Sequence, residues 1–173
     1  MTFHRFDLAA IAAALAFVTQ MSGVCAQGIT ATERETVLNL HNSYRAQHCV
    51  PPLTWSAQLA ASAQRWADKC SLMFHSPRAK SERYSENLAY GGNRTGSSAV
   101  DAWYKEVDSY NYAKPGFASA TGHFTQMIWR DTKQIGCGVA TCYFGSFRFW
   151  VCHYAPQGNW PGKFPQNVPQ RCK

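Results

Sequence analysis

The chain has a helical spacing of apolar residues over most of its length and an extended pattern near its end. In the first helical stretch, apolar side chains recur every three or four residues at Val37, Leu40 and Tyr44. Thr32 and Glu35 form a capping-box pair ahead of this stretch. We therefore expect a helix that begins near Thr32 and ends at about Gln47.

Two further helices follow from the same spacing. Ser56 can cap the second helix, whose apolar face comprises Leu59, Ala60, Ala63, Trp66, Ala67 and Cys70. Ser97 or Ser98 opens the third, which has Val100, Trp103, Tyr104 and Val107 on its inner side. Short helical turns are expected at residues 86–89 and 124–129, and a loop is expected at residues 110–122.

Near the C-terminus, residues 135–142 and 147–154 have the composition of β-strands, and a four-residue turn separates them. If Cys142 lies opposite Phe147, equal steps along the two antiparallel strands place Cys137 opposite Cys152. Helices followed by a hairpin predict an α+β domain built in layers.

The N-terminal segment has the features of an export signal. His4 and Arg5 give a weakly positive start, and the eleven residues 8–18 are apolar, too few for a membrane span of about 20 residues. We predict that residues 1–26 are a signal peptide cut after Ala26, which leaves residues 27–173 as a single secreted, extracellular domain. The alternatives are a lipoprotein anchor on Cys25 and an uncleaved membrane anchor.

The net charge is +7, and no run of like charges occurs. A basic exported protein is attracted to anionic membranes or cell-wall surfaces. Scattered charges and secretion both argue against a nucleic-acid partner. We also expect a monomer.

Seven cysteines are present, and six remain once Cys25 leaves with the signal peptide. An even number in an exported chain predicts three disulfides, and no C-x-x-C metal pair occurs. The hairpin register favours Cys137 with Cys152, because opposed Cα atoms lie about 4.5–5.5 Å apart, within reach of a disulfide.

The two other pairings are less constrained. Cys142 faces the opposite side of the sheet from Cys137, where a packed helix could present Cys70. Elimination would then leave Cys49 with Cys172. Six cysteines allow fifteen connectivities, so these two pairings stay open at this point.

Two motifs resemble the signatures of a known family. The sequences are GHFTQMIW at residues 122–129 and WVCHYAPQGNW at residues 150–160. They are similar to those of the CAP superfamily of cysteine-rich secretory proteins, antigen-5 venom proteins and pathogenesis-related class 1 proteins. HNSYR at 41–45, LTW at 53–55 and ENLA at 86–89 support the match. The resemblance covers about residues 33–160 and leaves a Pro-rich tail at 161–173.

This resemblance implies a three-layer α-β-α sandwich with a central antiparallel sheet, stapled by disulfides. It also implies the pairings Cys70 with Cys142 and Cys137 with Cys152. The chain resembles the minimal, single-domain form of the family, since the additional cysteine-rich domain of the mammalian members is missing.

The resemblance further implies a cleft lined by two histidines and two glutamates. Matched by motif, these fall on His75, Glu86, Glu106 and His123. No cofactor is required, but two imidazoles could hold Zn²⁺ or another divalent cation, with the carboxylates orienting them. The alternative is a hydrogen-bonded network that only fixes the fold.

Two lipid sites are also implied. Tyr110, Tyr112 and Phe117 occupy the first, third and eighth positions of a segment similar to the caveolin-binding motif of sterol-binding family members. A separate groove for a fatty acid would lie between two helices. Its candidate lining residues, which could equally be ordinary core, are Val37, Leu40, Tyr44, Val100 and Trp103.

We therefore expect a non-enzymatic protein that binds a sterol or another small lipid and acts in defence or host interaction. One alternative is a metal-dependent hydrolase that uses the four cleft residues. H-E-x-x-H and G-x-S-x-G are missing, although Glu86 and Glu106 form a carboxylate pair of the kind glycosidases use. The other alternative is a scaffold that presents loops to a receptor. Asn93 begins an N-glycosylation sequon.

Overall fold

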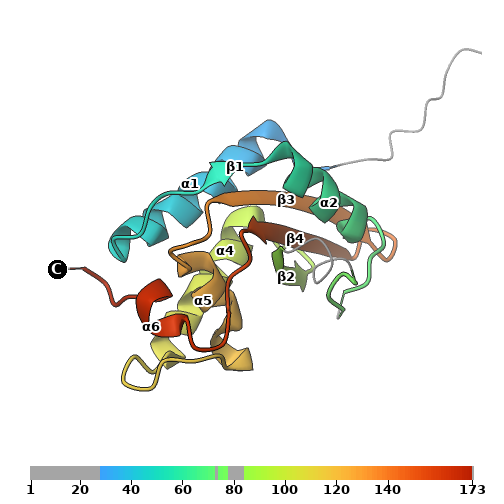
Figure 1. Cartoon of the computed structure of the whole chain (residues 1–173). Coiled ribbons are helices and arrows are strands. Elements are labelled where there is room, and N and C mark those ends of the chain that lie inside the picture. Colours follow the sequence, from blue (N-terminus) through green and yellow to red (C-terminus); the bar gives the residue numbers. More distant parts are fainter. Residues whose placement is uncertain (1–27, 73, 78–83, 173) are drawn as a thin grey trace, which may run out of the picture.

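The computed structural model describes residues 28–72, 74–77 and 84–172, so the expected signal peptide lies outside the described residues. Its elements along the chain (Figure 1) are α1 (Ala31–Gln47), β1 (Thr54–Trp55), α2 (Ala57–Ala67), β2 (Ser85–Gly91), α4 (Gly96–Lys105), η1 (Glu106–Ser109), η2 (Ser119–Thr121), α5 (Gly122–Ile128), β3 (Gln134–Cys142), β4 (Phe147–Ala155) and α6 (Phe164–Asn167). Within the described ranges, no helix is both long enough and apolar enough to cross a bilayer.

The sheet has four strands in the order β1-β3-β4-β2. The β3–β4 hairpin has the expected register, with Cys142 opposite Phe147 and Cys137 opposite Cys152. Strand β2 pairs antiparallel with β4, whereas the two-residue edge strand β1 runs parallel to β3. The expected antiparallel sheet is thus confirmed, apart from this short edge.

Helices cover both faces of the sheet, as the sandwich fold requires. Helix α2 lies on one side, with α4 and α5 on the other (Figure 1), and α1 packs against α4 and α5. The approach of α2 is close because β3 carries Gly136, where an added Cβ would lie 2.6 Å from the backbone of Leu59 and Ser56. Glycine is therefore required for this layer to pack on the sheet.

The larger core lies between the sheet and the layer of α1, α4 and α5, and it contains Trp129, Trp150 and Phe124. A smaller core of Ala63, Ala67, Ala140, Cys142, Phe149 and Val151 lies under α2. Apolar burial in both layers is the main force that holds the sandwich together.

Arg45 on α1 is fully buried and joins three parts of the larger core. Its guanidinium donates to the carbonyls of Pro51, Met127, Trp129 and Thr132 at 2.7–3.2 Å. Burial lowers its pKa to about 10, so it remains protonated at neutral pH. Carbonyl dipoles therefore solvate this buried charge, in place of an acidic partner.

Among the described residues there are three disulfides, and they are the three expected pairs. Cys137–Cys152 links β3 to β4, with Cα atoms 4.1 Å apart. Cys70–Cys142 ties the end of the α2 layer to the hairpin. Cys49–Cys172 joins the residues after α1 to the C-terminal tail.

Two expected helix starts were wrong. The capping box of α1 is Thr30 with Glu33, two residues earlier than expected. Glu33 is held there because Arg148 on β4 also pairs with it at 2.8 Å. Helix α4 is capped by Thr95, whose hydroxyl and amide exchange hydrogen bonds with Ser98.

Residues 86–89 were also expected to form a helical turn, but they lie within strand β2. Glu86 pairs with His153 and Ala89 with Trp150 across β4. The local sequence has little β-propensity, so cross-strand pairing decides its conformation. The expected turn at residues 124–129 is confirmed in position as helix α5, which starts two residues earlier at Gly122.

Candidate functional site

The first half of the candidate site is the carboxylate of Glu86, placed by strand β2 directly opposite His153 on β4. One oxygen accepts hydrogen bonds from His75 Nδ1 at 2.8 Å and from the Ser76 amide at 3.0 Å. The other accepts from His153 Nε2 at 2.8 Å. Burial alone would raise the pKa of Glu86, but these hydrogen bonds lower it to about 2. Glu86 is therefore a buried carboxylate with both oxygens occupied.

The second half is Glu106, the first residue of η1, which lies at the N-terminus of α5. It accepts hydrogen bonds from the backbone amides of His123 and Phe124 at 2.9 and 3.0 Å. Its other oxygen lies 2.6 Å from His123 Nδ1. A carboxylate is favourable at this position because it satisfies free amides at the positive end of the helix.

The two His–Glu pairs lie on opposite sides of the edge strand β2. Glu86 is on the face that carries α2, and the next residue, Asn87, is on the other face. The Asn87 amide donates to the His123 carbonyl at 3.2 Å and to the Tyr154 hydroxyl at 3.2 Å. Strand β2 thus connects both pairs through two consecutive side chains.

Both outer histidines reach solvent: the exposed fraction is 64% for the His75 side chain and 33% for that of His123. In the neutral imidazole, Nε2 carries the lone pair when Nδ1 donates to the carboxylate. Neither Nε2 has a partner among the described residues. A histidine whose second nitrogen is held by a carboxylate is the usual form of a metal-binding imidazole.

Of the four expected residues, the structure pairs His75 with Glu86 and His123 with Glu106. Across the described residues, no group of three or more His, Cys, Asp or Glu is arranged to hold a metal ion. The described residues therefore offer two separate imidazoles, each held by its own carboxylate, and no preformed metal cluster.

Two residues that hold Glu86, His153 and Ser76, were not predicted from the sequence. His153 is fully buried and stacks on Tyr84, with ring centroids 4.0 Å apart. Ser76 contributes its amide to Glu86. The pairing of β2 with β4 would have identified His153 as the partner of Glu86, but nothing in the local sequence of β2 indicates that pairing.

The aromatic residues of the proposed sterol loop have different environments. Tyr110 is 8% exposed and lies against Tyr112 and Phe124, with ring centroids 4.8 and 5.6 Å away. Phe117 is 63% exposed. Its ring would lie 3.0 Å from a Cβ added at Gly122, the residue before His123. The loop therefore has a buried aromatic base and one outward phenyl ring.

The residues of the proposed fatty-acid groove pack against one another in the larger core. Val37, Val100 and Trp103 are buried, and Leu40 and Tyr44 are half-buried against them. Tyr44 stacks on Tyr104 at 3.7 Å and donates to Asp101 at 2.7 Å. These five residues form part of the interface between α1 and α4.

Asn93 is exposed in the turn between β2 and α4. Its side chain is therefore accessible to a modifying enzyme. Whether it carries a glycan stays a prediction.

Comparisons with known proteins agree with the two sequence motifs. Residues 38–154 match the Cysteine-rich secretory protein family, CAP. Human Golgi-associated plant pathogenesis-related protein 1 is 41% identical over 138 residues, which are 76% of this chain and 89% of the relative. Protein PRY2 of Saccharomyces cerevisiae is 44% identical over 77% of this chain, but the match covers only 40% of that protein.

The fold also matches solved structures. Venom allergen-like protein 4 of Schistosoma mansoni is 25% identical to this chain, with a TM-score of 0.66 over 84% of this chain and 97% of that one.

Proposed function

Because the chain belongs to the Cysteine-rich secretory protein (CAP) family, we propose that it is a secreted, non-enzymatic protein that binds a sterol or another small lipid and acts in defence or host interaction. The name of the human relative supports the connection with defence. Three disulfides support an oxidising, extracellular environment.

The observation that carries the lipid proposal is the position of Phe117. Its phenyl ring is 63% exposed on a segment, residues 111–118, that contains neither helix nor strand. A flat, rigid ring system packs well on aromatic faces. Tyr110 and Tyr112 beneath the loop would provide further aromatic surface to a ligand that displaces Phe117. At Gly116, no atom lies within 4 Å of an added Cβ, so this part of the loop has room to move.

A titration of the purified protein with labelled cholesterol tests this proposal. We expect saturable binding that Phe117→Ser weakens by about tenfold or more, since burial of a Phe side chain contributes about 1.5–3 kcal/mol. Phe144→Ser is the matched control, because Phe144 is a fully exposed phenylalanine in the β3–β4 turn. Absence of saturable binding, or equal weakening by both substitutions, would contradict the proposal.

A second candidate function is metal binding by His75 and His123, supported by the two Nε2 atoms that have no protein partner. A bound Zn²⁺ would act as a Lewis acid and activate water, as the hydrolase alternative requires. Glu86 fixes the His75 ring through its Nδ1, and Glu106 fixes the His123 ring in the same way. Zn²⁺ titration by calorimetry should give one site that both His75→Gln and His123→Gln weaken. Loss of binding in only one variant would show that the pairs do not share an ion.

A further inference from the structure

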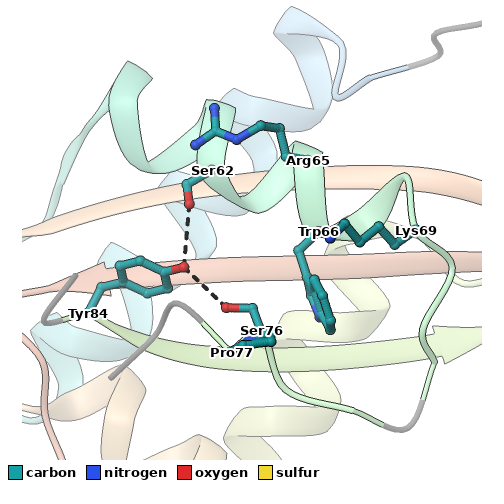
Figure 2. A pocket seen from close by; sticks show the side chains of 7 residues that line it. All are labelled: Ser62, Arg65, Trp66, Lys69, Ser76, Pro77 and Tyr84. Carbon is teal, nitrogen blue, oxygen red and sulfur yellow. Dashed lines mark hydrogen bonds between the residues drawn. The ribbon is translucent and has the colours of Figure 1, made fainter. Parts of the chain in front are cut away.

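A pocket of about 240 Å³ lies beside α2, on the sheet face opposite the Phe117 loop. Figure 2 shows the residues that line it, which are Ser62, Arg65, Trp66, Lys69, Ser76, Pro77 and Tyr84. We propose that this pocket binds a small apolar carboxylate. The site is separate from the Phe117 loop on which the lipid proposal above rests, and the proposed ligand is smaller than a sterol.

The geometry of α2 puts Arg65 and the Trp66 ring on one side of the helix. Ser62, Arg65 and Trp66 are spaced by three and four residues, so they share one face, and Lys69 lies two residues beyond the end of the helix at Ala67. The acidic residue nearest in sequence, Asp68 at the C-cap of α2, accepts a hydrogen bond from Gln64 at 2.7 Å. Gln64 also donates to Val139 on β3 at 2.8 Å, which places this pair toward the sheet. The Asp68 carboxylate is therefore not part of the pocket lining.

The aromatic walls are fixed before any ligand arrives. Trp66 and Tyr84 stand on opposite sides of the pocket in Figure 2. The Trp66 indole donates to the Phe74 carbonyl at 3.0 Å, and Tyr84 is stacked on the buried His153 ring at 4.0 Å. A preformed wall reduces the ordering entropy that binding would otherwise cost.

The inner end of the pocket is polar. The Tyr84 hydroxyl lies 3.1 Å from the Ser76 hydroxyl and 3.4 Å from that of Ser62, as the dashed lines in Figure 2 show. All three residues are buried. These hydroxyls are fixed relative to one another and can either donate to or accept from a bound group.

The charge of the pocket selects an anion. Among the described residues, neither Arg65 nor Lys69 forms an ion pair. The Lys69 ammonium lies 5.3 Å from the centre of the Trp66 ring, a cation–π contact that keeps it beside the apolar wall. Both cations line the pocket, and Lys69 lies beside the Trp66 ring, a combination that complements a ligand with a carboxylate and an apolar body.

The volume limits the size of that ligand. About 240 Å³ is below the roughly 300–1,000 Å³ of sites that hold drug-sized molecules. A short aliphatic or single-ring carboxylate fits this limit, whereas a sterol does not.

The test uses octanoate as the probe, with 1-octanol as its uncharged match and octylammonium as its cationic match. Each is titrated into ¹⁵N-labelled protein while the indole N–H signals are followed by NMR. We expect octanoate to saturate and to shift the Trp66 signal, with the two matches binding about tenfold more weakly or not at all, since hydrogen bonds to charged groups contribute about 1.5–3 kcal/mol.

Variants assign the site. Arg65→Gln with Lys69→Gln should weaken octanoate binding by about tenfold, whereas Arg130→Gln with Lys163→Gln, which removes the same charge elsewhere, should not. Ser62→Leu should fill the pocket and block octanoate binding. If Ser62→Leu does not fold, the double substitution of the exposed Arg65 and Lys69 still tests the site. Phe117→Ser should leave octanoate binding unchanged. Non-saturating shifts, equal loss in both charge variants, or loss in Phe117→Ser would overturn the proposal.

Discussion

Glu106 holds His123 at two points, through the backbone amide at 2.9 Å and through ring Nδ1 at 2.6 Å. The same carboxylate therefore caps helix α5 and orients the imidazole at its start. Any change at Glu106 affects helix stability and the direction of His123 Nε2 together. Glu86 differs from Glu106 in this respect, because Glu86 is buried inside the sheet layer and caps no helix.

Replacement of Glu106 by Ala should destabilise the protein by about 1–3 kcal/mol, because two backbone amides and one ring nitrogen lose their acceptor. Glu106→Gln should cost less, since its amide oxygen can still accept both backbone hydrogen bonds, which go to the same carboxylate oxygen. Urea unfolding at pH 7 measures both. Glu35→Ala, a change at an exposed glutamate of α1, is the control and should have little effect.

Glu86 should make the protein sensitive to acid below pH 4.5. Its pKa is about 2 in the folded protein and 4.5 in the reference state, so the unfolded chain takes up a proton first as the pH falls. The resulting stability, on the order of 3 kcal/mol, is present above pH 4.5 and is lost between about pH 4.5 and 2.

The Glu86→Gln variant provides the measurement. It should be less stable than the wild type at pH 7, and the difference in unfolding free energy should shrink as the pH falls toward 2. A difference that stays constant over this range would show that Glu86 does not titrate as expected.

His41 should control stability in a higher pH range. Burial lowers its pKa from 6.5 to about 4. The charge of Arg45 lowers this pKa further, whereas the hydrogen bond to the Val37 carbonyl raises it. The unfolded chain binds a proton below pH 6.5 while the folded protein does not, so stability falls as the pH drops from 6.5 to 4, by about 3 kcal/mol.

His41→Asn removes this titration and should flatten the unfolding free energy between pH 6.5 and 4. A residual slope of the same sign is expected, because burial also lowers the pKa of His48. An unchanged slope in His41→Asn would assign the effect to other groups.

Gly136→Ala should be strongly destabilising, by about 3 kcal/mol or more, because the new methyl group would overlap the backbone of α2. Gly116→Ala is the matched control, since no atom lies within 4 Å of its added Cβ. It should be neutral or slightly stabilising, as the unfolded chain loses conformational freedom. Thermal unfolding of the two variants checks both expectations.

The elements that sequence analysis placed correctly are those whose signals are local. The Ser56 cap, the end of α1 at Gln47 and the hairpin register all depend on residues close together in the chain. Strand β2 was missed because its conformation depends on pairing with β4, whose residues lie 57 to 69 positions further along the chain. The start of α1 was misplaced for a similar reason, since Arg148 on β4 holds Glu33.

The candidate site followed from motif resemblance and not from spacing, because its four residues lie on separate segments. The resemblance placed His75, Glu86, Glu106 and His123 but gave no indication of which histidine pairs with which carboxylate. It also did not indicate His153, whose role depends on strand register. The α2 pocket could not be predicted, because Tyr84 and Ser76 reach it only through tertiary packing.

The Cys49–Cys172 bond closes a ring that contains most of the folded chain, with 123 positions between its ends. A protease that cuts one exposed loop inside this ring, such as residues 111–118, would open the ring without releasing a fragment. The two pieces would stay covalently joined and could keep their packed arrangement. A cut would therefore appear on a gel only after reduction, and the protein could survive a first cleavage outside the cell.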